Sequence, residues 1–330
     1  MTVTEALDAR VGAWFGPGSV LRWDGPPSHH AWSVQFRPTA VAPDGREVPL
    51  VVKVPVWDAA PTLDDALAAG PQQDTREEAD ALAAIAAMVD ESGDPGLDAV
   101  RVIEYVPAVN AIVMERFPGS PLRSLLGRRV PGDPFAAAGR WLRHFHESVG
   151  GVAPGSFDAD AVAGDVGRAA ATLGRPDLVD RLAPALHRLG AAPVAVGATH
   201  GDFTLANVLV DADGRVAVID PNRYRGAAAG DVARFVVDLR THRVRAASLG
   251  LLPTSRRLRR WTTAFLDGYG DVDGEVLATM TAVAAIHRWA DAAEASRGSV
   301  ARRTLGGAVV RRCAAEARST LAAIGVPVPA

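Results

Sequence analysis

Three polar residues near the middle of the chain have the types and spacing of a centre that binds a metal ion and moves a proton. Asn207 follows Asp202 by five positions, and Asp220 lies thirteen positions further on. An amide carbonyl and a carboxylate are hard oxygen ligands that suit Mg²⁺, which takes its other ligands from water and substrate phosphates. A second carboxylate beside such an ion can accept a proton from an attacking hydroxyl, or orient it. The pattern therefore predicts Asp202 as a base and the other two residues as metal ligands.

A predicted β-hairpin would bring these residues together. Two short runs rich in β-branched residues flank a polar turn that contains Asp-Gly, a signal typical of paired strands. We expect Val210 to pair near Val216. That register places Asn207 opposite Ile219 or Asp220, at a separation of roughly 5 Å. The polar residues would then meet at one end of the hairpin, which is the geometry of a divalent-cation site.

This stretch resembles the aminoglycoside phosphotransferase family, whose members are relatives of the protein kinases and phosphorylate small molecules. The resemblance rests on His200-Gly201-Asp202, Asn207, Val218-Ile219-Asp220 and Gly230-Asp231. It implies that Asp202 is the catalytic aspartate and that Asn207 and Asp220 bind Mg²⁺. The implied reaction moves the terminal phosphoryl group of ATP or GTP, with the division of labour found in protein kinases.

A single lysine supports the same interpretation. The chain has 34 Arg and one Lys, Lys53, which lies in the strand-like run 49–56. A compact ammonium on a flexible stem acts as a point charge between phosphate oxygens, whereas a planar guanidinium requires a forked partner. By the resemblance, Lys53 would hold the α- and β-phosphates of the nucleotide. The alternative is that an Arg-rich composition left one Lys at a strand position by chance.

A lysine in this role needs an acidic partner from the next helix. The segment 75–89 is a strong predicted helix, because it is rich in Ala and has acids in its first turns. The resemblance implies a Glu followed by a small residue and then a Leu, which Glu78 fits best. Glu77 is the near alternative, and the other acids at the helix start are predicted to be solvated.

The order of elements predicts a mixed α/β fold, and the resemblance implies a two-lobed, protein-kinase-like architecture. The small lobe would be β-rich with one helix, and the large lobe mostly α-helical. We expect strands within 18–56 and over 100–106 and 111–117, and helices over 75–89, 135–149, 160–189, 231–239, 255–269, 275–295 and 300–324.

A breaker cluster at Phe117–Pro121 suits a linker between the lobes. We place the boundary there, with a nucleotide-binding lobe over 1–117 and a catalytic, substrate-binding lobe over 118–330. The resemblance makes this segment the hinge, where backbone groups near 114–116 would bind the nucleotide base. Glu115 and Arg116 are therefore predicted to contact the nucleotide.

Several neighbouring residues have two interpretations. His200 could join Asp202 and Asp220 as a metal ligand of a hydrolase that activates water, or it could simply support the catalytic loop, which we favour. Asp231 could brace the loop, as the resemblance implies, or cap its own helix. His144 and His146 are predicted to be structural, because residues two apart on a helix point to different faces.

The sequence departs from the family pattern at three places. A Gly-x-Gly-x-x-Gly phosphate loop is missing, and the corresponding region is 25–32. The second acid expected after Gly230-Asp231 is replaced by Phe235, and Pro221 follows the predicted metal ligand where an aromatic residue is common. The missing loop keeps open the alternative of a non-catalytic, nucleotide-binding scaffold.

Length and composition limit the classes of protein to which the chain can belong. The chain has 330 residues, of which 48% are hydrophobic, enough to bury two cores. Cys313 is the single cysteine, and the sequence has neither a signal-peptide pattern nor an apolar run of about 20 residues. We therefore expect a soluble cytoplasmic protein without a membrane partner. The bias toward Ala, Gly and Arg suggests a bacterial origin.

Charge gives a hint about the acceptor. From Pro221 onward the chain has 17 Arg against nine acids, although the total net charge is −3. A basic lobe suits a polycationic acceptor poorly. The net charge and the lack of basic motifs with interleaved aromatic residues argue against nucleic acid. The predicted partners are a nucleoside triphosphate and a hydroxylated small molecule, such as a sugar, amino-sugar or antibiotic.

Overall fold

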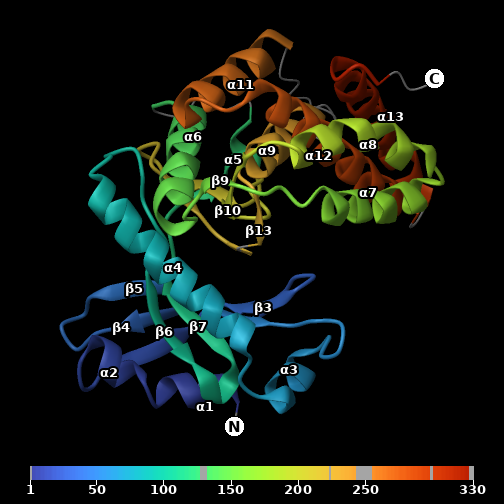
Figure 1. The fold of residues 1–330 in the computed structure, drawn as a ribbon. Helices are drawn as coiled ribbons and strands as arrows, with labels where there is room; N and C mark the ends of the chain where they lie inside the picture. Colours follow the sequence, from blue (N-terminus) through green and yellow to red (C-terminus); the bar gives the residue numbers. More distant parts are fainter. Residues whose placement is uncertain (1, 127–131, 223, 243–254, 298–299, 327–330) are drawn as a thin grey trace. The chain divides into compact units, whose positions relative to one another are not determined.

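The computed structural model describes residues 2–126, 132–222, 224–242, 255–297 and 300–326 (Figure 1). The chain divides into two compact units. The first unit contains Met1–Gly93 and Asp98–Pro118, and the second contains Asp94–Leu97 and Gly119–Ala330. The first is β-rich and the second mostly helical, which confirms the predicted mixed α/β class. None of the described helices is long and apolar enough to cross a membrane.

The first unit is built on one antiparallel sheet. Its strands are β1 (Val20–Trp23), β2 (Ser28–His29), β3 (Ser33–Phe36), β4 (Pro38–Val41), β5 (Glu47–Pro55), β6 (Val102–Val106) and β7 (Ala111–Glu115). β5 is the longest and pairs with β3, β4 and β7, while β6 pairs with β7. Because side chains alternate along a strand, Leu50, Val52 and Val54 of β5 all face the core and are fully buried.

The helices of the first unit are α1 (Val3–Asp8), α2 (Val11–Phe15), α3 (Leu63–Ala69), α4 (Gln73–Ser92) and a 3₁₀ turn, η1 (Pro107–Val109). The expected helix over 75–89 is α4, which packs on β6 and β7. The prediction of a single helix was wrong. Thr2 and Thr62 each form a capping box with an acid three residues on, Glu5 and Asp65, and these boxes start short helices that show little periodicity.

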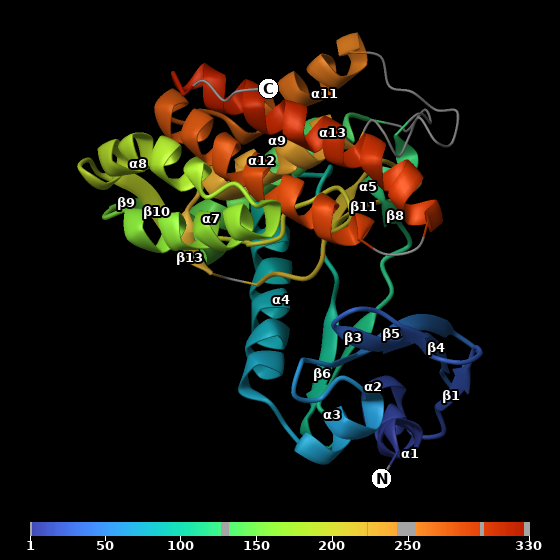
Figure 2. The same cartoon turned by 90° about the vertical axis from the view of Figure 1, so that its right-hand side faces the viewer.

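The second unit is mainly helical (Figure 2). Its helices are α5 (Leu122–Leu125), α6 (Pro134–His144) with a π-helical turn η2 (Phe145–Val149), α7 (Ala159–Leu173), α8 (Asp177–Gly190), α9 (Ala229–Thr241), α11 (Ser255–Tyr269), α12 (Gly274–Ser296) and α13 (Val300–Ala323). Long α12 packs against α7, α9 and α13, and α6 packs against α11. Each helix predicted for this part of the chain is present.

Two small sheets complete the second unit. The first has the order β13-β10-β9 and the second β12-β11-β8; their strands are β8 (Ser120–Pro121), β9 (Ala153–Gly155), β10 (Val194–Ala198), β11 (Val208–Val210), β12 (Val216–Val218) and β13 (Arg225–Ala227). β11 and β12 form the predicted hairpin.

A fully buried aromatic cluster lies beside this hairpin. Phe203, in the loop before β11, stacks on Trp141 of α6 and on Phe265 of α11. Phe235 of α9 stacks on Phe265 with ring centroids 4.1 Å apart. The residue that replaces the family's second acid is therefore part of the core that supports the loop.

Candidate active site

The hairpin places Asn207 and Asp220 at the same end of its two strands. Val210 pairs with Val216, which confirms the predicted register. Beyond the strands, the N–H of Ile219 donates to the carbonyl oxygen of Asn207 at 3.0 Å, and Asp220 follows directly. Asp220 has a left-handed backbone with φ of 58°. Such a conformation costs a non-glycine residue of order 1–3 kcal/mol and is found preferentially at functional sites.

Asn207 is tied to Asp202 by its side chain. Its Nδ2 donates to the carboxylate Oδ2 of Asp202 at 2.8 Å and to the carbonyl oxygen of the same residue at 2.9 Å. Because the amide nitrogen is used in this way, Oδ1 is the atom of Asn207 that can bind a cation. Together with the carboxylate of Asp220 it offers two hard oxygen donors, a set that fits Mg²⁺ completed by water and phosphate oxygens.

The carboxyl group of Asp202 is partly buried, and its surroundings set its acidity. Burial raises its pKa above the ordinary value, and the negative charges of Asp220 and Asp238 act in the same direction. Arg234 of α9 opposes this effect, with its guanidinium 3.9 Å from Oδ1 of Asp202. The result is a carboxylate with increased basicity, as a group that accepts a proton requires.

His200 is a structural residue of the loop. It is fully buried, Nδ1 accepts a hydrogen bond from the N–H of Asp202 at 3.3 Å, and Nε2 lies 3.1 Å from the carbonyl oxygen of Ile219. Burial lowers its pKa, so the imidazole is neutral. Because both ring nitrogens contact the main chain, the metal-ligand interpretation of His200 was wrong. Within the described ranges, no group of three or more His, Cys, Asp and Glu residues is placed to hold a metal ion.

Asp231 braces the same loop and does not cap its helix. Its carboxylate accepts the N–H of His200 at 2.6 Å and that of Gly201 at 2.9 Å, and it lies 3.0 Å from Nε2 of His146. Burial alone would raise the pKa of Asp231, but the hydrogen bond and charge of His146 outweigh it and hold the pKa below its ordinary value. His146 also contacts the hydroxyl of Tyr269 at 3.0 Å, so it is structural, as predicted.

Two further residues of α9 were missed in the sequence. Asp238 accepts the N–H of Leu205 at 3.0 Å, which fixes the other end of the loop. Arg234 is the basic residue beside Asp202. Both lie on the face of α9 that carries Asp231, at i+3 and i+7, and this helical spacing was the available signal.

In the first unit, the structure brings together Lys53 of β5 and Glu78 of α4. The ammonium nitrogen lies 2.6 Å from Oε1 of Glu78, and both side chains are largely buried, with 13% and 17% exposed. Glu77, the alternative partner, instead accepts a hydrogen bond from Gln73 on the helix surface. The pair is formed as expected, while its role toward a nucleotide stays a prediction.

The predicted base-binding segment lies at the end of β7. The N–H of Glu115 donates to the carbonyl oxygen of Arg101 at 2.8 Å, and the N–H of Arg116 donates to that of Pro49 at 2.9 Å. Since sheet pairing uses both donors, any contact of these two residues with a nucleotide base must be made by other groups. The prediction that Glu115 and Arg116 contact the nucleotide therefore stays a prediction, limited to groups other than these two N–H donors.

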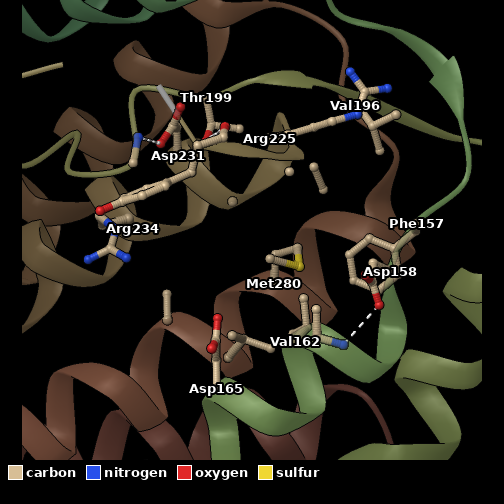
Figure 3. A pocket seen from close by; sticks show the side chains of 18 of the residues that line it. Phe157, Asp158, Val162, Asp165, Val196, Thr199, Arg225, Asp231, Arg234 and Met280 are labelled. Carbon is tan, nitrogen blue, oxygen red and sulfur yellow. Dashed lines mark hydrogen bonds between the residues drawn. The ribbon is translucent and has the colours of Figure 1, made fainter. Parts of the chain in front are cut away.

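Two adjoining pockets lie in the second unit next to the loop. The larger has a volume of about 480 Å³ and is lined by α7, α9, α12 and β13 residues, several of which are shown in Figure 3. The smaller, of about 190 Å³, includes Asp202. Arg234, Ala284 and His287 line both, so the larger pocket opens toward the predicted base.

Fold and site together define a phosphoryl-transfer protein of the kinase-like class. Residues 44–248 match the phosphotransferase enzyme family, APH, and the chain belongs to that family. The chain is therefore a phosphotransferase enzyme, which decides against the scaffold and hydrolase alternatives. No curated protein matches the chain at a significant level.

Solved structures show the same fold. A choline/ethanolamine kinase family protein from Mesorhizobium loti is 18% identical, with 98% of this chain and 99% of that chain covered and a TM-score of 0.56. A glucosamine kinase in complex with glucosamine, ADP and inorganic phosphate is 18% identical, with 96% and 85% covered and a TM-score of 0.55. An amicoumacin kinase is 12% identical, with 89% and 87% covered and a TM-score of 0.55. These likenesses confirm the kinase-like fold.

Proposed function

We propose that this phosphotransferase moves the γ-phosphoryl group of ATP or GTP to a hydroxyl of a small molecule, in a Mg²⁺-dependent reaction. The observation that carries the proposal is the hydrogen bond between Asn207 and Asp202 at the end of the hairpin that also presents Asp220. One end of this hairpin thus brings together the residues proposed as the base and as the two cation ligands, which are the parts that phosphoryl transfer requires.

Asp202 is the proposed base. Its carboxylate accepts the proton of the acceptor hydroxyl while the hydroxyl oxygen forms a bond to the γ-phosphorus. The bond from that phosphorus to the bridging oxygen breaks, and the nucleoside diphosphate leaves. Asn207 holds the carboxylate in place through the bond to Oδ2, and Asp231 and Asp238 fix the loop that carries it.

Asn207 and Asp220 would hold Mg²⁺ through Oδ1 and the carboxylate. When bound, the ion supplies positive charge that stabilises the phosphate oxygens. The carbonyl oxygen of Asn207 is kept in the ladder by Ile219, so its side chain leaves a fixed main chain. This rigidity is what a cation site requires of a ligand.

Lys53 would bind the α- and β-phosphates of the nucleotide. The carboxylate of Glu78, 2.6 Å away, keeps the ammonium group oriented within a largely buried setting. At the end of β7, Glu115 and Arg116 would contact the base through groups other than their N–H donors. We also propose a cytoplasmic location, which suits a chain with one buried, free cysteine.

The proposed acceptor is a hydroxylated metabolite, sugar, amino-sugar or antibiotic. The glucosamine kinase whose fold is similar was solved with glucosamine and ADP, and the amicoumacin kinase with amicoumacin. The pocket of about 480 Å³ beside the loop has the volume of a site for a molecule of this size.

Calorimetry of Mg²⁺-dependent ATP and GTP binding tests the proposal without knowledge of the acceptor. Wild type should bind at least one nucleotide, and Asp220→Ala should lose the Mg²⁺-dependent part of the affinity. Asp213→Ala, which removes an exposed carboxylate from the turn of the same hairpin, is the matched control. A screen of hydroxylated acceptors for phosphorylation would follow. Failure of wild type to bind either nucleotide would contradict the proposal.

A further inference from the structure

The pocket of about 480 Å³ beside the loop has an apolar body. Phe157, Val162 of α7, and Met280 and Val283 of α12 contribute large apolar side chains to its lining. Figure 3 shows Met280 between the α7 residues and the residues around β13 and α9. A site of this composition gains affinity by covering an apolar surface of its ligand.

The acidic groups of the pocket are already engaged. Asp158 accepts the N–H of Ala161 at 2.9 Å and caps α7. Asp231 is committed to the catalytic loop. Asp165 forms an ion pair with Arg168 one turn further along α7. Within this pocket, a ligand with several ammonium groups would therefore find few carboxylates available.

The basic groups of the pocket have fewer partners than its acidic groups. The guanidinium of Arg225, in β13, has no hydrogen-bond or ion-pair partner among the residues that the structure describes, while its main chain pairs with Ala198 in the sheet. Arg234 has one acid nearby, Asp202 at 3.9 Å. The two guanidinium groups lie toward different ends of the pocket (Figure 3), with Arg234 at the end that adjoins the base.

His287 of α12 adds a neutral polar group. Its Nε2 is buried and has no hydrogen-bond partner in the described part of the chain. Burial lowers its pKa, so the imidazole is uncharged near neutral pH. Because His287 lines both pockets, a ligand that extends from one pocket to the other passes beside this imidazole.

We infer that the acceptor is a hydroxylated molecule with an apolar body and an anionic group distant from the reacting hydroxyl. The hydroxyl lies at the Asp202 end, the body covers Phe157 and Met280, and a carboxylate or similar anion pairs with Arg225. This inference rests on the proposed function, because it assigns the pocket to the acceptor. It distinguishes this protein from an enzyme built for polycationic aminoglycosides, which would need unpaired carboxylates.

A matched series of aryl glucosides tests the inference. The probes are 4-carboxyphenyl β-D-glucoside, phenyl β-D-glucoside and 4-(aminomethyl)phenyl β-D-glucoside, with kanamycin as the polycation. Binding is measured by calorimetry with the Mg²⁺ complex of a non-hydrolysable ATP analogue present. We expect the carboxylate compound to bind about three- to tenfold more tightly than the neutral one, since Arg225 is exposed and its charged hydrogen bond is partly screened.

Substitutions at Arg225 supply the decisive comparison. Arg225→Ala should remove the preference for the carboxylate compound, and Arg225→Glu should reverse it in favour of the aminomethyl compound. Arg259→Glu makes the same charge change on the exposed surface of α11 and should leave the order unchanged. Three results would overturn the inference. Wild type could bind kanamycin or the aminomethyl compound more tightly than the carboxylate compound, it could bind none of the four probes, or the order of affinities could be unaffected by substitution of Arg225.

The proposed function and the inference about the acceptor can be contradicted independently of each other. A protein that binds neither ATP nor GTP contradicts the proposed function itself. A protein that binds Mg²⁺-nucleotide and phosphorylates a cationic acceptor in preference contradicts only the inference about the anionic group.

Discussion

Asp231→Asn tests whether the buried carboxylate of α9 holds the loop that carries Asp202. In wild type, Oδ1 accepts the N–H of Gly201 at 2.9 Å and Oδ2 accepts the N–H of His200 at 2.6 Å. An asparagine keeps the shape but replaces one oxygen with an amide NH₂. Whichever way the amide is turned, one main-chain N–H then faces another donor.

The expected loss follows from these two groups. A buried donor without an acceptor costs about 1–3 kcal/mol, and two such donors, the main-chain N–H and the amide NH₂, are created. We therefore expect the second unit to lose about 3 kcal/mol of unfolding free energy. In units of 150–250 residues each kcal/mol corresponds to about 2–4 °C, so its melting temperature should fall by about 6–12 °C. The second unit lies within that range of length.

Differential scanning calorimetry is the suitable assay, because it can resolve separate transitions of the two units. Asp267→Asn, at an exposed aspartate of α11, is the matched control and should shift the melting temperature by less than about 2 °C. Turnover of Asp231→Asn should fall as well, since Gly201 and Asp202 are adjacent. A variant that melts within about 2 °C of wild type and keeps full turnover would refute the bracing role.

Three further predictions concern nucleotide binding, the base and the loop. Lys53→Met should weaken Mg²⁺-ATP binding more than Glu78→Gln does, because only the first substitution removes the charge proposed to contact phosphate. Calorimetry measures both affinities, and equal affinities of wild type and Lys53→Met would contradict this prediction. Activity should fall as pH decreases through the pKa of Asp202, which burial raises above its ordinary value, and a pH–rate profile should show this acidic limb. Arg234→Gln removes a positive charge that lowers the pKa of Asp202, so the acidic limb of the pH–rate profile should move to higher pH. An unchanged position of this limb would show that Arg234 does not influence the pKa of Asp202. Gly201→Ala should reduce thermal stability, because φ is +78° and a Cβ would lie 2.8 Å from the ring of Tyr224; an unchanged melting temperature would show that the loop relaxes.

The parts of the site that could be predicted from the sequence depend on local patterns. The hairpin register follows from two short β-branched runs and an Asp-Gly turn. This register by itself predicts that Asn207 lies opposite Ile219. Glu78 could be selected over Glu77 because it fits the family's pattern of a Glu followed by a small residue and then a Leu. The helices of the second unit were long enough for their apolar periodicity to show.

The missed features depend on contacts between distant segments. The N–H groups of Glu115 and Arg116 are used by neighbours at Arg101 and Pro49, and nothing local to β7 shows that pairing. Arg234 lies near Asp202 because α9 packs beside the loop that carries Asp202, and this contact joins distant segments of the chain. The short helices α1 and α3 differ, because their capping boxes were visible but span too few residues to form a periodic pattern.

The base assignment is tested most directly by turnover of Asp202→Asn, with Asp213→Asn as the control. Asparagine can still accept the hydrogen bond from Asn207, so the loop should keep its structure, but it cannot accept the proton. With an acceptor found in the screen, we predict a loss of about 10²–10⁴-fold in turnover while Mg²⁺-nucleotide affinity stays near that of wild type. Turnover near the wild-type level in Asp202→Asn would contradict the account of this protein as a phosphotransferase that uses Asp202 as its base.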